Sequence, residues 1–168
     1  MAGPEGVSAS VDALEQLYRS RYRRFLRLAV AIVGSRDAAA DVVQEAFASA
    51  LRSRHSFRGE GSLESWVWRM VINSARTYEQ RTARGRPLTG EVETMAAGEN
   101  GHAARWPELR AAVAALPERQ RHVLFLRHYA DLGYDEIGEV LGIARGTVSA
   151  TLHAAHASLR RHMAEVTR

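Results

Sequence analysis

The sequence predicts an all-α protein made of two small helical domains joined by a flexible linker, with a helix-turn-helix as the C-terminal domain. Apolar residues recur at three- and four-residue steps, and no segment shows the alternation of a strand. This periodicity lapses between about residues 82 and 104, where glycines gather and large apolar residues are few. Near the C-terminus, two short helical patterns flank Gly142. We therefore place the domains at 11–83 and 105–165 and the linker at 84–104.

Three helices are expected in the N-terminal domain. The first has an apolar side formed by Leu14, Leu17, Tyr18, Phe25, Leu28 and Ile32. Gly34 ends this helix, and Ser35 can cap the next one by accepting a hydrogen bond from a free backbone N–H. That second helix runs to about Arg52 and is expected to bury Val43, Phe47, Ala50 and Leu51. After a glycine-containing loop, Ser62 can cap a third helix.

Shorter helices are expected in the C-terminal domain, at 106–116, 117–129, 134–141 and 146–163. Pro117 suits a helix start because its missing N–H would be unpaired there anyway. The last two helices, joined by a tight turn, form a helix-turn-helix whose longer second helix fits a DNA major groove. Its buried side is Val148, Leu152, Ala155 and Leu159. The alternative is a plain helical hairpin with a solvated polar side.

Composition excludes several classes of protein. The 168 residues hold no cysteine, so disulfides and cysteine chemistry are absent, and no apolar run is long enough to cross a bilayer. We expect a cytoplasmic protein that does not insert into membranes. All 23 basic residues are arginine, and the net charge is +4. Arginine suits phosphates and guanine edges, which makes the composition compatible with a nucleic-acid partner.

Enzymatic and metal chemistry find little support in the sequence. No convergent acid–base pair and no phosphate-binding glycine loop is evident. His153 and His156 are three residues apart on a helix, but zinc usually takes four ligands and no others are evident nearby. We therefore expect no catalytic residue, no metal and no cofactor.

The C-terminal segment resembles a known family. Leu116-Pro117, Glu136-Ile137, Gly142-Ile143 and Gly146-Thr147-Val148 match the promoter-binding region 4 of the extracytoplasmic-function (ECF) sigma factors. A helix-turn-helix regulator of the LuxR type, which acts without docking on polymerase, has a similar C-terminal segment. The resemblance implies contact with the −35 element through Arg145, Thr147, Ser149, Ala150, His153 and His156. Family members often carry basic side chains where this chain has Ser149-Ala150-Thr151, so we expect a weak or unusual −35 contact.

The N-terminal segments resemble the same family. Residues 37–51 look like its polymerase-docking helix, which implies that Asp37, Asp41, Gln44 and Glu45 contact the β′ clamp helices. Residues 57–81 are similar to its segment that melts and reads the −10 element. The residues expected to contact single-stranded DNA there are Phe57, Arg58, Trp68, Asn73, Arg76 and Arg81. Trp66 and Trp68 cannot share one side of a helix, and we expect Trp66 to be the packing residue.

Taken together, the resemblance implies a sigma factor, not an enzyme. It implies binding to core RNA polymerase through the β′ clamp helices and the β flap, and binding to promoter DNA. An anti-sigma factor is the expected regulator. The LuxR-type regulator remains the alternative.

Overall fold

The computed structural model describes residues 8–83 and 107–166. Its helices are α1 (Val11–Val33), α2 (Arg36–Ser53), the 3-10 helix η1 (Arg54–Ser56), α3 (Leu63–Ala83), α4 (Pro107–Ala114), α5 (Glu118–His128), α6 (Tyr134–Leu141) and α7 (Arg145–Val166). Within these ranges there is no strand, and the predicted all-α fold class is confirmed. The linker predicted at 84–104 lies outside the described residues. Among the described helices, none is both long enough and apolar enough to cross a membrane.

The helix boundaries follow from local chemistry. Gly34 ends α1 in the left-handed region, at a φ of 78°, where a Cβ would be strained. The hydroxyl of Ser35 then accepts a hydrogen bond from the N–H of Ala38, as predicted. The hydroxyl of Ser62 accepts from the N–H of Ser65 at 2.9 Å, which caps α3 in the same way.

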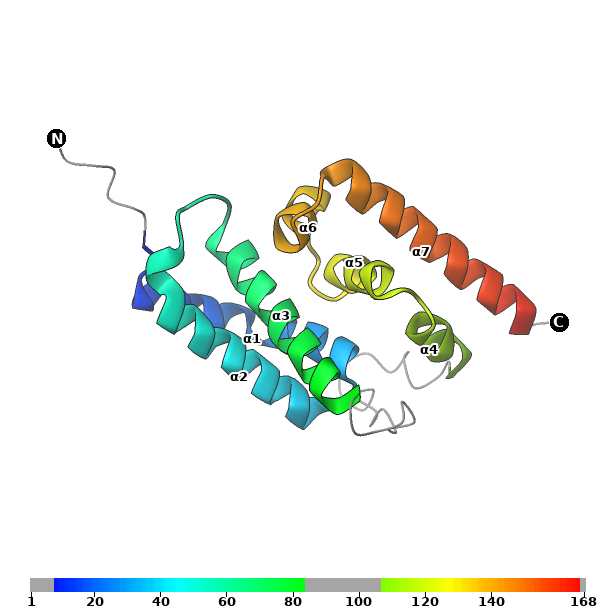
Figure 1. The fold of residues 1–168 in the computed structure, drawn as a ribbon, viewed down its shortest axis with the longest axis horizontal. Helices are drawn as coiled ribbons and strands as arrows, with labels where there is room; N and C mark the ends of the chain where they lie inside the picture. Colours follow the sequence, from blue (N-terminus) through cyan, green and yellow to red (C-terminus); the bar gives the residue numbers. More distant parts are fainter. Residues whose placement is uncertain (1–7, 84–106, 167–168) are drawn as a thin grey trace.

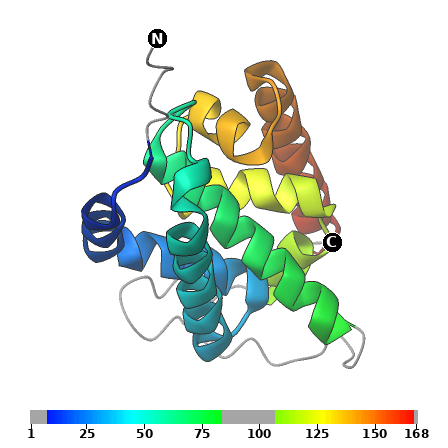
Figure 2. The same ribbon diagram turned by 60° about the vertical axis from the view of Figure 1, so that its left-hand side comes forward.

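The N-terminal half is a bundle of α1, α2 and α3 (Figures 1 and 2). Phe25 of α1 lies at its centre, with its ring 4.1 Å from that of Trp68 on α3 and 5.3 Å from that of Phe47 on α2. Tilted and edge-on aromatic pairs of this kind add specific geometry to the large apolar area that they bury. These contacts determine which sides of α2 and α3 face the core of the bundle and which sides face away from it.

In the C-terminal half, α6 and α7 form the predicted helix-turn-helix. Gly142 joins them in the left-handed region, at a φ of 66°. Gly138 allows the chain after the turn to approach α6 closely, because a Cβ there would lie 2.7 Å from the carbonyl oxygen of Ile143. Val148, Leu152 and Ala155 are buried as predicted. The turn and this apolar side together leave the opposite side of α7 exposed.

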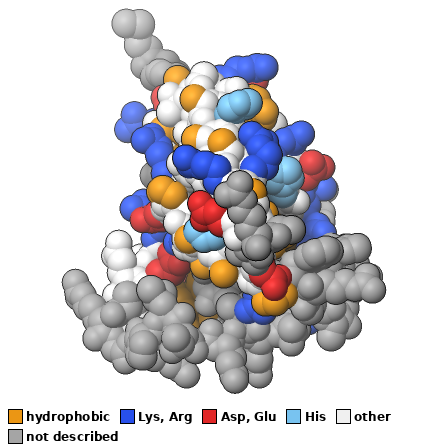
Figure 3. Space-filling view, turned by 90° about the vertical axis from the view of Figure 1, so that its right-hand side faces the viewer, with side chains coloured by type: hydrophobic (Ala, Val, Ile, Leu, Met, Phe, Trp, Pro, Cys, Tyr) orange, Lys and Arg blue, Asp and Glu red, His pale blue; other side chains and the backbone are white. Residues whose placement is uncertain are grey.

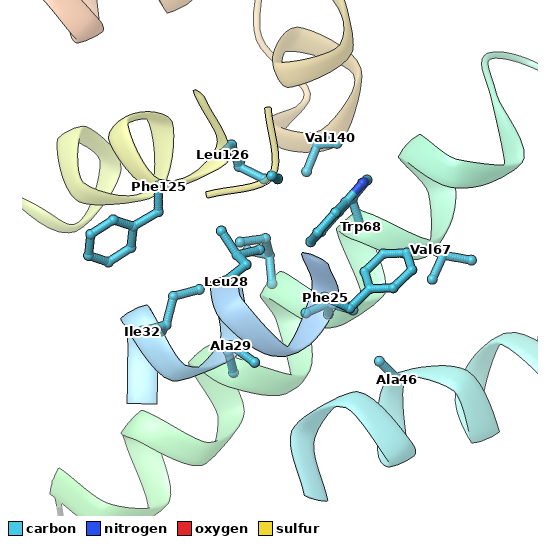
Figure 4. Close-up of a cluster of buried hydrophobic side chains, with 14 of the residues drawn as sticks. Phe25, Leu28, Ala29, Ile32, Ala46, Val67, Trp68, Phe125, Leu126 and Val140 are labelled. Carbon is cyan, nitrogen blue, oxygen red and sulfur yellow. The ribbon is translucent and has the colours of Figure 1, made fainter. Parts of the chain in front are cut away.

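The two halves share one hydrophobic core, which the sequence did not predict. Helix α3 packs against α6, and α1 packs against α5. Figure 4 shows Leu126 of α5 and Val140 of α6 beside Leu28 of α1 and Trp68 of α3, and all four side chains are buried. Burial of apolar surface stabilises such a contact roughly in proportion to its area. In this structure the two halves therefore form one packed body.

Candidate nucleic-acid interface

The acidic side of α2 faces solvent. Asp37, Asp41, Gln44 and Glu45 are all exposed, and the opposite side of the helix packs on α1 and α3. The prediction that Leu51 is buried on that packing side is wrong, because Leu51 is 38% exposed near the end of the helix. Glu45 forms an ion pair with Arg52 at 2.7 Å, an exposed contact that is worth little in free energy. The four side chains are thus exposed together on one side of α2, as the sequence predicted.

The expected roles of the two tryptophans are reversed in the structure. Trp68 is 0% exposed and its indole N–H donates to Glu64 at 3.3 Å. It belongs to a buried row with Val71 and Ala75, spaced three and seven residues along α3. Trp66 is the partly exposed tryptophan. The prediction that Trp68 contacts single-stranded DNA is therefore wrong for this structure, because no part of its ring reaches the surface.

Phe57 is also unavailable as a surface contact. Only 9% of it is exposed, and its ring lies 5.4 Å from that of Trp66. The ring is turned into the core beneath the loop that joins η1 to α3. The prediction that Phe57 offers a stacking surface is wrong for this conformation. Its neighbour Arg58 is exposed on the loop, where Gly59 and Gly61 have positive φ values of 71° and 91°.

The other three residues predicted to contact the −10 element, Asn73, Arg76 and Arg81, are exposed. Asn73 and Arg76 share one side of α3 with Arg69, because steps of four and seven residues return to the same side of a helix. Arg69 donates to the backbone carbonyl of Glu139 at 2.5 Å, and Arg76 pairs with the carboxylate of Glu118 at 2.7 Å. The sequence reasoning did not single out Arg69, although its spacing from Asn73 and Arg76 places it on the same side of the helix.

Most of the predicted DNA-reading residues of α7 are accessible. Arg145, Thr147, Ser149, Ala150 and His153 are exposed, and His156 is half-buried. Figure 3 shows arginine and histidine side chains spread among apolar ones on the side of the molecule where α7 lies. The N-terminal part of α7 is therefore free to enter a groove, as a recognition helix does.

Two of these side chains have partners that were not predicted from the sequence. Arg145 donates to the carboxylate of Asp135 on α6 at 2.8 Å. The Nε2 atom of His156 lies 3.4 Å from that of His128 on α5. Burial and the proximity of His156 both lower the pKa of His128, which favours the neutral form of the His128 ring. Each pair ties α7 to another helix of the same half.

Charged and polar side chains gather where α5 meets α3, and one of them, His122, is buried. His122 is buried, its Nε2 has no hydrogen-bond partner, and burial lowers its pKa from 6.5 to about 4. Its Nδ1 is 3.9 Å from the carboxylate of Glu118, which opposes that shift. Glu79 on α3 lies 3.7 Å from Arg121, and burial raises the pKa of its carboxyl.

The helix-turn-helix alone is compatible with a sigma factor and with a LuxR-type regulator, and comparison with known families distinguishes the two. Residues 17–85 match the family described as sigma-70 region 2, and residues 107–159 match the one described as sigma-70, region 4. The sigma-E factor of Escherichia coli is 33% identical over 135 residues, which cover 71% of this chain and 70% of that protein. The chain belongs to the ECF family of RNA polymerase sigma factors.

Other relatives of this sigma factor support the assignment over nearly the whole chain. The sigma factor YlaC of Bacillus subtilis is 27% identical over 160 residues, covering 90% of this chain and 92% of YlaC. Among solved structures, CnrH in complex with the cytosolic domain of CnrY has a TM-score of 0.71 at 19% identity, with 94% and 91% of the two chains covered. The sigma factor RpoE of Bartonella quintana, in complex with the anti-sigma factor NepR, has a TM-score of 0.65 at 19% identity, with 94% and 100% covered. The likeness to these two structures shows the fold.

Proposed function

We propose that this ECF sigma factor binds core RNA polymerase and directs it to promoters through two separate DNA contacts. The N-terminal half would bind the β′ clamp helices and the −10 element, and the C-terminal half would bind the β flap and the −35 element. The observation that carries the proposal is the presence, on one chain, of both sigma regions with an exposed acidic side on α2. Polymerase makes the phosphodiester bonds, so this chain needs no catalytic residue and acts in the cytoplasm, where the polymerase works.

The proposed polymerase contact is the acidic side of α2. Asp37, Asp41 and Glu45 carry negative charge, and Gln44 adds a hydrogen-bonding amide among them. The family resemblance implies that the partner is a basic coiled coil. Complementary charge of this kind steers encounter and fixes orientation. All four side chains are exposed, so docking requires no rearrangement of α2.

The proposed −10 contacts are Arg58 in the loop before α3 and Asn73, Arg76 and Arg81 along α3. Guanidinium groups bind backbone phosphates and stack on unpaired bases, whereas an amide can hydrogen-bond a base edge. Phe57 and Trp68 support these residues from the core. Trp66 and Tyr78, which are both partly exposed, supply the aromatic surface that remains in the segment.

The proposed −35 contact is the exposed side of α7, led by Arg145 at its N-terminal end. Thr147, Ser149, Ala150 and His153 follow it, with His156 further along the helix. Small and hydroxyl side chains make fewer charged contacts than arginine does. A modest −35 affinity is therefore expected, with polymerase binding supplying much of the promoter occupancy.

An anti-sigma factor is the proposed regulator. The two solved structures above are sigma factors of the same fold, and both are held in complexes, one with CnrY and one with the anti-sigma factor NepR. A partner of this class would cover the acidic side of α2 or the exposed side of α7, which are the surfaces that polymerase and promoter DNA require.

Run-off transcription tests the proposed function. Core polymerase alone and core polymerase with this protein are compared on a library of genomic fragments from the source organism. We expect discrete transcripts only when the protein is present, and footprints that cover both promoter elements. Binding of duplex DNA without any polymerase-dependent transcript would contradict the proposal and favour an independent helix-turn-helix regulator.

A further inference from the structure

The structure brings together two histidines from different helices of the C-terminal half. His128 is the last residue of α5 and His156 lies midway along α7, and these two helices lie side by side (Figure 1). Helical spacing in the sequence singles out His153 and His156 instead, and predicts no metal from them. The pair in the structure joins positions 28 residues apart, so only the fold reveals it.

The rings of His128 and His156 face each other through their Nε2 atoms. These two atoms are 3.4 Å apart, whereas the ring centroids are 5.7 Å apart, so each Nε2 is on the side of its ring nearest the other ring. A tetrahedral zinc ion with bonds of about 2.0–2.1 Å to two imidazole nitrogens holds those nitrogens about 3.3–3.4 Å apart. The separation in the structure is therefore that of two ligands of one ion, and a small rotation of the rings directs both lone pairs to it.

The surroundings of the pair suit a bound cation. His128 ends α5, where the free backbone carbonyls of the last turn carry partial negative charge and favour cations. Burial and the proximity of His156 favour the neutral form of the His128 ring by lowering its pKa, and the neutral imidazole is the form that binds a metal. The neighbouring Arg127 opposes a cation there, but its guanidinium donates to the carbonyl of Leu132 at 3.2 Å and pairs with Asp131 at 3.8 Å.

A direct hydrogen bond between the two rings is the alternative explanation of the contact. One neutral ring can donate its Nε2–H to the Nε2 of the other ring. The separation of 3.4 Å is longer than the range of about 2.7–3.2 Å that hydrogen bonds with N–H donors usually have. Such a bond would be weak, and an ion between the rings would replace it with two coordinate bonds.

We propose that His128 and His156 form a two-histidine zinc site that links α5 to α7. Zinc is the ion chosen because it is tetrahedral in most protein sites, whereas octahedral and square-planar ions hold adjacent ligands closer together, at about 2.8–3.0 Å. In the described part of the chain, no group of three or more histidine, aspartate or glutamate side chains is placed to hold a metal, so water supplies the other ligands. An ion held by two side chains exchanges readily, and the link therefore forms only when zinc is available. The site does not depend on the proposed promoter contacts.

The zinc affinity of the full-length protein, without a polyhistidine tag, tests the site. Zinc is titrated in competition with a fluorescent zinc chelator. The affinity should be at least about tenfold lower in His128→Gln and in His156→Gln than in the wild type, because even the outer-shell partners of a zinc ligand are worth about 10–100-fold. His153→Gln is the matched control, because His153 is exposed on the same helix as His156 and lies outside the pair. Its zinc affinity should equal that of the wild type, and circular dichroism verifies that every variant keeps its helices.

Two further measurements identify the ligands directly. In protein labelled with ¹⁵N-histidine, zinc should shift the Nε2 resonances of His128 and His156 and leave those of His153 in place, each resonance being assigned from the variant that lacks it. Zinc binds the folded state, so it should also raise the unfolding temperature of the wild type and of His153→Gln. The same zinc concentration should raise it in neither His128→Gln nor His156→Gln.

The contrary outcomes are distinct. Equal zinc affinity in the wild type and in both pair variants would place the ion elsewhere and overturn the site. Loss of affinity in His153→Gln and His156→Gln, but not in His128→Gln, would assign the ion to the two histidines of α7 instead. No binding by the wild type at submillimolar zinc would show that the two rings of the pair are only neighbours. Transcription with core polymerase tests the proposed function separately, and neither result decides the other.

Discussion

Arg145, the first residue of the recognition helix, donates a 2.8 Å hydrogen bond to the carboxylate of Asp135 on the preceding helix. Both side chains are about 70% exposed, so water competes with the pair and its contribution to stability is small. The pair matters because it sets the direction in which the Arg145 guanidinium points. Asp135 holds the guanidinium back toward α6, and DNA must draw it away before Arg145 can contact a base or a phosphate.

Arg145→Ala should therefore impair −35-dependent transcription, and Asp135→Asn should strengthen duplex binding by releasing Arg145. Loss of a bidentate guanine contact costs about 1–3 kcal/mol and relaxes preference at one base pair. Loss of a phosphate contact weakens all sequences alike and lowers the salt slope by about one. Promoter affinity across a salt series distinguishes a lost guanine contact from a lost phosphate contact.

Asp131→Asn removes the same charge from an exposed site and is the control for Asp135→Asn. An equal gain from Asp131→Asn and Asp135→Asn would show that only net charge matters.

Reversal of two charges on α2 tests polymerase docking. Asp41→Arg combined with Glu45→Arg should abolish binding to core polymerase, because both exposed side chains would then repel a basic partner. The helical fold should persist, since neither residue is in the core. Affinity is measured by fluorescence anisotropy with labelled core enzyme, and folding by circular dichroism. Asp12→Arg with Glu15→Arg makes the same change on exposed sites of α1 and should leave binding intact.

Substitution of the two tryptophans should have opposite consequences. Trp68→Ala removes a fully buried ring between Phe25 and Val140 and should lower the free energy of unfolding by about 3–5 kcal/mol. Trp66→Ala should cost much less, because that ring is only partly buried. Urea denaturation measures both. Equal losses for the two variants would contradict the burial pattern of α3.

Local features of the structure were predictable because their causes are local. Gly34 and Ser35 mark the boundary between α1 and α2 through backbone conformation and capping, which depend on neighbouring residues. Gly142 identifies the helix-turn-helix in the same way. The exposed side of α2 follows from helical spacing once its apolar side is known. The fold class, and the exposed positions of the four α2 residues proposed to dock on polymerase, could therefore be predicted before the structure was known.

Non-local features were not predictable. Trp66 and Trp68 are equally apolar, and only the position of Phe25 on another helix decides which ring is enclosed. The pairing of Arg76 with Glu118 joins residues on either side of the predicted linker, and no periodicity relates them. Phe57 was expected to contact single-stranded DNA because its segment resembles the −10-reading part of the family, yet the loop turns that ring inward. Each error concerns a direction that tertiary packing sets.

The buried imidazole of His122 should make stability depend on pH. Its pKa falls from an ordinary 6.5 to about 4 in the folded protein because burial disfavours the charged ring. The unfolded chain therefore binds a proton more readily than the folded one between these values. The contribution is complete above about pH 6.5 and is lost progressively as the pH falls toward 4, by about 3 kcal/mol in all.

Replacement of the His122 imidazole by a phenyl ring isolates the effect of its protonation on stability. His122→Phe should flatten the fall in unfolding free energy between pH 6.5 and 4, because the proton-binding group is gone. At pH 7 the variant should be no less stable than the wild type, since the buried Nε2 has no hydrogen-bond partner to lose. His162→Ala, at an exposed position, should leave the pH profile unchanged. Urea denaturation at a series of pH values gives the free energy of unfolding of the wild type and of both variants. If His122→Phe retains the full acid-induced loss, the imidazole is not the group that titrates, and the carboxyl of Glu79 on α3, whose pKa burial raises, becomes the next to substitute.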